Sequence, residues 1–272
     1  MRHRRALPAK AAICAIITIG IIIAAIGASS LVWPSAPGDD VKKKNGMTVD
    51  VSNSDDGYVM GKYTQSQKRL KFRLTLADDS YTYDLNGDGD YEVFPLQMGN
   101  GKYNAKVFKQ ASGNRYTQEA SQNFNVKLSS DDAPFLCPNQ YIWYTQESPA
   151  VAMSNELCEG LQTDAEKLEA IRSYVRSNFS YNYMRAMTVT SGYLPDLDCV
   201  YEEKSGICFD IAGITACMLR VQGVAAKMAI GYANTSYHAW NEVLIDGEYI
   251  LVDITSEITA ANVTSYAVER VY

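Results

Sequence analysis

The first half of the chain alternates apolar and polar residues, which is the period of half-buried β-strands. Two such stretches, residues 72–76 and 81–85, flank a short polar turn at residues 77–80 that would join them as a hairpin. We therefore predict a small antiparallel β-domain over residues 47–135, with a β-sandwich as the expected arrangement. Further short strands are expected over residues 91–94, 103–108 and 124–128.

The apolar period becomes helical after residue 136. A capping box at Thr163–Glu166 predicts the start of a helix, and Leu168, Ile171 and Val175 would share its apolar face. A polar bridge that contains Pro134 precedes this region, which is the expected boundary between the two domains.

A second helix is expected to begin near Cys208 and to end before Gly223. It carries almost no charge, so we predict that it is buried. Residues 136–272 therefore predict an α+β fold in which a buried helix packs on an antiparallel sheet. Four strands are expected to form that sheet, over residues 224–232, 238–245, 248–253 and 266–271.

The N-terminus has the pattern of an export segment. Four basic residues lie within the first ten, and residues 11–28 carry no charge. This predicts a signal peptide or a membrane anchor over residues 1–33: residues 25–27 resemble a cleavage site, but the apolar run is long enough to span a bilayer, which favours the anchor. The basic flank would stay in the cytoplasm and the rest of the chain would lie outside the cell. Residues 34–46 are rich in proline, serine, glycine and lysine and are expected to form a linker.

Charge argues against nucleic acid as a partner. The whole chain carries −6, and without the four N-terminal basic residues the remainder carries −10. Five cysteines lie in the part expected outside the cell, so at least one thiol must stay unpaired, and a Cys137–Cys158 disulfide is one option for the others.

Cysteine catalysis needs a thiolate, a nearby imidazole and usually an acceptor that orients the imidazole. The chain has two histidines, and His3 lies in the export segment, so His238 is the only base available to the exported part. Cys208 falls in the first turn of the predicted buried helix, where free amide groups and the helix dipole stabilise a thiolate. Cys208 and His238 are therefore the candidate nucleophile and base.

A predicted hairpin indicates which acid faces His238. The Asp246–Gly247 pair is a strong two-residue turn signal between two strand-like runs. Continuing that register places Asp253 opposite Trp240 and Thr255 opposite His238. His238 and Asp253 would then be diagonal neighbours on one face, about 7 to 8 Å apart at the backbone, which side chains can close.

Three short motifs resemble the transglutaminase-like superfamily: Lys204–Asp210, His238–Trp240 and Val252–Thr255. The resemblance covers roughly residues 158–272. In that family a G-x-C cysteine, an H-A-W histidine and a D-P-T aspartate form a papain-like triad in this order. The resemblance thus implies a papain-like core with the triad Cys208, His238 and Asp253; Ile254 stands where proline is usual, but the carboxylate is kept.

The family includes protein cross-linkers, peptide and amide hydrolases, and binding modules without activity. The resemblance therefore implies cysteine-dependent acyl transfer on protein or peptide amides, by hydrolysis or transglutamination through a thioester, with cell-wall peptide among the candidate substrates. It implies no cofactor. The alternative is a non-catalytic cell-surface protein that binds peptide or wall polymer. In either case we expect an extracellular domain, held by the membrane anchor or secreted if the N-terminal segment is cleaved.

Other residues are weaker candidates. Trp240, Tyr181 and Tyr183 are aromatic residues in or near the motifs and are candidates for substrate binding. The favoured interpretation is a cover over the triad for Trp240 and ordinary core or surface packing for the two tyrosines. Asp84–Gly89 matches the opening of a calcium-binding EF-hand loop, but Pro95 occupies the twelfth position, where a glutamate is needed. We therefore interpret that stretch as a polar turn and expect no metal site.

Overall fold

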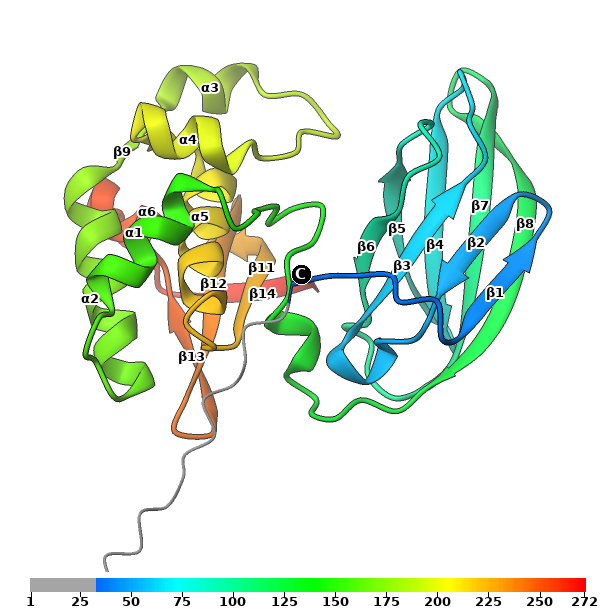
Figure 1. Cartoon of the computed structure of the whole chain (residues 1–272). Coiled ribbons are helices and arrows are strands. Elements are labelled where there is room, and N and C mark those ends of the chain that lie inside the picture. The colour runs from blue at the N-terminus through cyan, green and yellow to red at the C-terminus, as the bar shows by residue number, and fades with distance from the viewer. Residues whose placement is uncertain (1–32) are drawn as a thin grey trace, which may run out of the picture.

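The computed structural model describes residues 33–272, which form a β-rich half followed by a mixed half of helices and strands (Figure 1). The expected export segment lies outside the described residues, apart from Trp33. Within residues 33–272 no helix is both long enough and apolar enough to cross a membrane.

The β-rich half consists of two four-stranded antiparallel sheets that share one buried core. Phe72 of one sheet and Phe94 of the other stack in that core, with their ring centroids 4.1 Å apart. The prediction of an antiparallel β-region before the main core is confirmed. In spatial order the first sheet contains β1 (Val41–Lys44), β2 (Met47–Asp50), β3 (Tyr58–Tyr63) and β6 (Glu92–Pro95), and the second contains β5 (Asp79–Leu85), β4 (Leu70–Leu76), β7 (Gly101–Ser112) and β8 (Arg115–Val126). One-turn 3₁₀ helices, η1 (Ser54–Asp56) and η2 (Ala133–Phe135), lie in the connections.

The segment expected to be a linker differs from its prediction. Residues Val41–Lys44 form strand β1 and pair with β2 around the turn Asn45–Gly46. Both turn residues have positive φ, 47° and 82°, as a two-residue hairpin requires. The asparagine–glycine pair is the sequence signal for this hairpin. The lysine run was interpreted as part of a linker, although charged residues are also typical of edge strands.

The C-terminal half has the predicted α+β fold, with helices packed on the antiparallel sheet β13-β12-β11-β14 (Figure 1). The strands of this sheet are β11 (Ala226–Ala233), β12 (Ser236–Ile245), β13 (Glu248–Val252) and β14 (Tyr266–Val271). The helices are α1 (Pro149–Leu157), α2 (Asp164–Asn178), α3 (Tyr183–Thr188), α4 (Leu197–Glu203), α5 (Cys208–Arg220) and α6 (Ile254–Thr259). A short parallel pair, β9 (Ser180–Tyr181) and β10 (Ser205–Gly206), leads into α5.

Local sequence signals account for the two helices that were predicted. The capping box at the start of α2 is formed: Thr163 Oγ1 accepts from the Glu166 amide, and the Glu166 carboxylate accepts from the Thr163 amide. Helix α5 is buried along almost its whole length against β11 and β12, as its lack of charge predicts. The helix thereby holds Cys208 at a fixed point against the sheet.

The two halves are in contact through several side chains. The ring of Tyr272 packs against Tyr141 and against Tyr81 of the β-rich half, with centroids 4.1 and 5.5 Å apart. Arg270 also forms an ion pair of 2.7 Å with Asp79 across the boundary. These contacts fix the end of β14 against the β-rich half.

The cysteines of the described residues are all free, so the Cys137–Cys158 disulfide is not formed. Cys137 and Cys158 are buried, and burial raises the pKa of both thiols. They behave as small apolar core residues.

Candidate active site

Cys208 is the first residue of α5, and its side chain is partly exposed in a cleft. The amide groups of the first helical turn are free of intrahelical partners and point towards this end of the helix. Gly206 allows the tight approach of the chain before the helix, because a Cβ there would lie 2.6 Å from the Cβ of Asp210. The glycine two residues before Cys208 is therefore required by packing.

His238 connects the other two candidate residues. Its Nε2 atom lies 2.9 Å from Oδ2 of Asp253, and the thiol of Cys208 is the second side chain with which the ring interacts. Since Nε2 is engaged by the carboxylate, Nδ1 is the ring nitrogen left for the thiol. The structure thus brings the three sequence-predicted residues together in the order cysteine, histidine, aspartate.

The electrostatics of this group favour a charged imidazole. Burial alone lowers the pKa of His238, but the hydrogen bonds and negative charges of Asp253 and Cys208 outweigh it and raise the pKa to about 9. Burial opposes the ionised form of Asp253 as well, yet hydrogen bonds from His238 and Ser256 leave the pKa of its carboxyl below the usual value. At neutral pH the pair is an imidazolium beside a carboxylate.

The local structure around Asp253 differs from the hairpin prediction. The turn at Asp246–Gly247 and its register are as predicted, but the ladder ends at the pair Asn241–Val252. Asp253 then leaves the sheet and caps α6, where its Oδ1 accepts from the amide of Ser256 at 3.0 Å. The predicted pairing of His238 with Thr255 is therefore wrong, because residue 255 is already helical.

Two hydroxyl groups missed by the sequence analysis hold the Asp253 carboxylate. Ser256 Oγ and the hydroxyl of Tyr266 both donate to Oδ2, the oxygen that faces His238, and the Tyr266 bond is 2.9 Å long. Tyr266 comes from β14, at the far edge of the sheet from β13. With four donors in all, the carboxylate has little freedom to rotate away from the imidazole.

Trp240 and the two tyrosines predicted for substrate binding occupy three different environments. Trp240 is buried, only 1% exposed, and its ring stacks beside His238 with centroids 6.3 Å apart. It does not line the cleft and supports the imidazole from behind. Tyr181 does line the cleft. Tyr183 does not: it is 63% exposed and touches the edge of Tyr181.

A buried acid two residues after Cys208 was also missed. Asp210 is fully buried and accepts from the Ile207 amide at 2.9 Å and from the Tyr193 hydroxyl at 2.7 Å. Arg185 lies 3.4 Å from the same carboxylate. Asp210 thus joins the start of α5 to the segment that forms one wall of the cleft.

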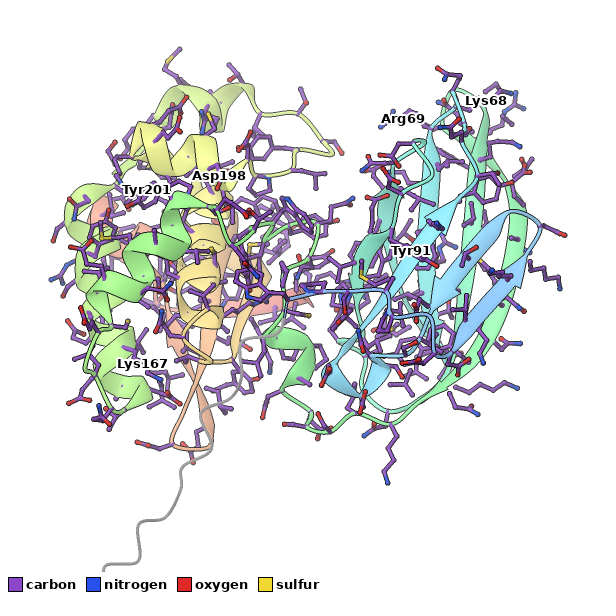
Figure 2. All side chains as sticks on the ribbon, in the orientation of Figure 1. Lys68, Arg69, Tyr91, Lys167, Asp198 and Tyr201 are labelled. Carbon is purple, nitrogen blue, oxygen red and sulfur yellow. The ribbon has the colours of Figure 1, made fainter. Side chains whose placement is uncertain are left out.

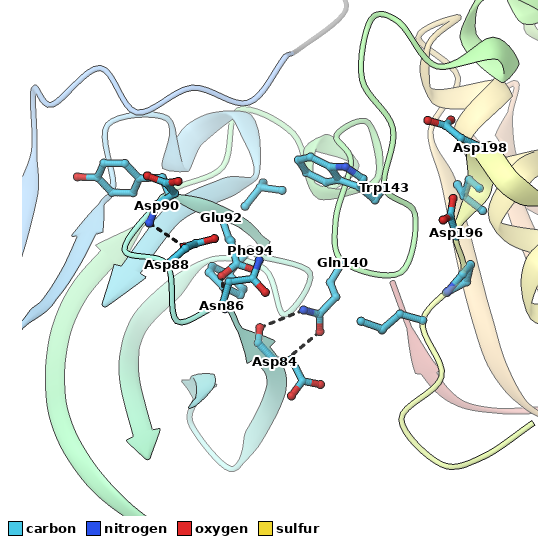
Figure 3. Close-up of a pocket in the computed structure, with 15 residues that line it drawn as sticks. Asp84, Asn86, Asp88, Asp90, Glu92, Phe94, Gln140, Trp143, Asp196 and Asp198 are labelled. Atoms are coloured by element: carbon cyan, nitrogen blue, oxygen red, sulfur yellow. Dashed lines mark hydrogen bonds between the residues drawn. The ribbon is translucent and has the colours of Figure 1, made fainter. Parts of the chain in front are cut away.

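The acidic stretch Asp84–Gly89 lines a separate hollow at the boundary of the two halves. Figure 3 shows Asp84 beside Gln140, which exchanges two hydrogen bonds of 3.0 Å with the backbone of Asp84. Asp198 of α4 and Tyr91 of the β-rich half, both labelled in Figure 2, line opposite sides of it. Burial raises the pKa of Glu92 here to about 7, and the nearby charges of Asp88 and Asp84 add to the effect. No group of three side chains within residues 33–272 is arranged to hold a metal ion.

The comparison with protein families agrees with the motifs. The model of the transglutaminase-like superfamily matches residues 151–254, a stretch that includes Cys208, His238 and Asp253. Residues 151–254 are therefore a transglutaminase-like domain, and the resemblance noted in the sequence is confirmed for that part of the chain. Among curated proteins, none matches the sequence.

Solved structures give more distant similarities. A proposed cysteine protease from Cytophaga hutchinsonii is 18% identical, with 73% of this chain and 74% of that chain covered and a TM-score of 0.41. The periplasmic domain of TgpA from Pseudomonas aeruginosa is 17% identical, with 84% and 77% covered and a TM-score of 0.38. A transglutaminase is 21% identical over 43% of this chain and 32% of that chain, with a TM-score of 0.35. None reaches 25% identity, so no activity is transferred from these proteins.

Proposed function

We propose that this protein is a cysteine-dependent acyl transferase or hydrolase that acts on protein or peptide amides through a Cys208–His238–Asp253 triad. The observation that carries the proposal is the imidazole of His238, held by Asp253 on one side and in contact with the thiol of Cys208 on the other. The thiol stands at the start of a buried helix and opens into a cleft, where an amide can approach it.

In the proposed reaction His238 starts as the imidazolium, having taken the proton of the Cys208 thiol. The thiolate attacks the carbonyl carbon of a glutamine side chain or a peptide bond, and the negative oxygen that forms can accept from the Cys208 backbone amide. His238 returns its proton to the departing nitrogen, which leaves as ammonia or an amine, and a thioester remains on Cys208. Water then gives a free acid, while a second amine gives a new amide; in both cases His238 takes the proton of the attacking group and the thiolate is released.

Asp253 keeps its charge throughout this cycle. Its role is to hold Nε2 of His238, so that Nδ1 faces the thiol, and to stabilise the imidazolium. Ser256 and Tyr266 hold the carboxylate in turn.

A covalent probe tests the proposal. A glutamine-like peptide whose side chain ends in a chloroacetamide should label Cys208 of the purified protein and release chloride, and the labelled site is read by mass spectrometry. Cys199 is exposed on α4 and its thiol is hydrogen-bonded to Glu203, so it serves as an internal control. Labelling of Cys199 but not Cys208 by both this probe and iodoacetamide would contradict the enzyme and favour a binding protein.

We also propose that the domain works outside the cell, on the basis of the basic and apolar pattern of residues 1–33. Protease added to intact cells should then digest the chain after Trp33. Complete protection of that region, while a known surface protein in the same cells is digested, would contradict export.

A further inference from the structure

The cleft around Cys208 is aromatic and free of charged residues other than His238. It has a volume of about 450 Å³, and no aspartate, glutamate, lysine or arginine lines it. Tyrosine hydroxyls and the small polar residues of segment 190–192 supply its polar atoms. Six aromatic side chains line the cleft: Tyr141, Tyr181, Tyr193, Phe209, Tyr237 and Tyr272.

Two acids beside the triad are engaged by other groups and turned away from the cleft, and a third, Glu269, lies near Tyr237 at the rim but does not line the cleft. Asp210 is fully buried and takes hydrogen bonds from Ile207 and Tyr193, and Asp253 is held by His238, Ser256 and Tyr266. A lysine side chain in the cleft would lose water without gaining a free carboxylate. A glutamate side chain could pair only with the imidazolium of His238, which would block the reaction.

Acidic residues begin where the cleft ends. Residues 189–193 line the cleft, and the next residues, Leu194–Asp198, line the acidic hollow instead (Figure 3). The same loop therefore separates an uncharged surface beside Cys208 from a negative one beyond it. Charge is present near the site but is kept out of contact with the reacting group.

Exposed apolar side chains also lie on elements that contribute to the cleft. Helix α3 leads into the loop that lines one side, and it exposes Met184 and Met187 to 68% and 73%. On the other side Tyr237 is 64% exposed and its ring meets that of Tyr232, with centroids 5.6 Å apart. A polypeptide that leaves the cleft past Tyr237 would therefore meet further aromatic surface.

We infer that the substrate is a polypeptide whose reactive amide is flanked by uncharged aromatic or aliphatic side chains. This inference rests on the proposed function and names the substrate class of the same site. Burial of an aromatic side chain against these rings is favourable, whereas a charged one must be dehydrated without a partner. The flanking residues thereby select the substrate.

Three matched probes test this inference. Each carries the chloroacetamide in place of the glutamine amide, and the two flanking residues are phenylalanine, lysine or glutamate. The rate of Cys208 labelling by each probe is divided by the rate with iodoacetamide, which has no flanking residues. We expect the phenylalanine probe to react at least about tenfold faster than either charged probe, since ~1.4 kcal/mol corresponds to a factor of ten and dehydration of an unpaired charge costs more.

A rim variant makes the test sharper. Tyr237→Glu places a carboxylate on the cleft and should raise the labelling rate of the lysine probe relative to the phenylalanine probe, by about fivefold or more. Tyr116→Glu, on strand β8 of the other half, is the matched control and should leave the ratio unchanged.

The outcomes separate this inference from the proposed function. Equal rates for the three probes, faster reaction of a charged probe, or labelling by iodoacetamide alone would overturn the substrate class and leave the nucleophile in place. Failure of every reagent to label Cys208, while Cys199 is labelled, would overturn both.

Discussion

The imidazole of His238 and the carboxylate of Asp253 lie 2.9 Å apart although they belong to different kinds of element. His238 lies in strand β12, and Asp253 is the residue at which the chain leaves β13 and begins α6. One side chain therefore caps a helix with Oδ1 and holds the imidazole with Oδ2. Local folding of this corner and orientation of the candidate base depend on the same carboxylate.

Replacement of that carboxylate should reduce activity and change its pH dependence. In Asp253→Asn we expect the rate of the acylation step to fall by roughly 10³- to 10⁴-fold, because the amide can stabilise the wrong tautomer of His238 and cannot balance its charge. In the parent protein the imidazolium loses its proton as pH rises through about 9, so activity should decline there. The variant should lose activity at lower pH, since the interaction that raises the histidine pKa is gone. A pH profile of the rate that did not move would contradict this role.

Replacement of Tyr266 is a milder test of how the Asp253 carboxylate is held. Tyr266→Phe removes one hydrogen bond to the oxygen that faces His238 and should lower activity about tenfold, which corresponds to roughly 1 to 1.5 kcal/mol. The alkaline limb of the pH profile should also shift, which a purely structural defect would not cause. Tyr116→Phe, on strand β8 of the other half, is the control that should change neither.

The two partly or fully exposed cysteines should differ in reactivity. At pH 6 to 7 we expect iodoacetamide to modify Cys208 much faster than Cys199, because His238 interacts with the Cys208 thiol and can take its proton. Glu203 hydrogen-bonds the Cys199 thiol and raises its pKa, so that thiol should react only at higher pH. The ratio is measured by peptide mass spectrometry, and His238→Ala should reduce it sharply. Equal rates in the parent protein would mean that Cys208 is not activated.

The hydrogen bond between Tyr193 and Asp210 should affect substrate binding. Tyr193→Phe keeps the ring in the cleft but frees the wall segment from the start of α5. We expect KM to rise several-fold with a smaller change in kcat, and the free energy of unfolding to fall by about 1 kcal/mol. An unchanged KM together with a lower kcat would instead place Tyr193 in the chemical step.

Elements with local signals were predictable from the sequence. The capping box of Thr163 and Glu166 and the turn at Asp246–Gly247 are both specified within a few residues, and the structure shows both. Cys208 was placed at a helix start because it follows Gly206 and the segment after it carries almost no charge. These features depend on near neighbours along the chain, which a sequence displays directly.

The residues that hold the candidate triad in place were not predictable in the same way. Tyr266 meets Asp253 only because β14 joins the sheet beside β11, and nothing near either residue indicates that contact. Asp210 could have been found, since an acid at the third position of a helix often accepts from the amide before it. Its partners Arg185 and Tyr193 come from a distant segment that carries no comparable signal.

The central claim is that Cys208 and His238 act as one chemical unit. The most direct measurement is a double-mutant cycle with Cys208→Ser, His238→Ala and both changes together, in which the rate on a glutamine peptide is measured and melting temperatures close to that of the parent serve as the folding control. Each single variant should abolish nearly all turnover, and the double variant should be scarcely slower than either one, because the loss of one member already disables the other. Losses that multiply in the double variant would show that the two residues act independently and would contradict the triad.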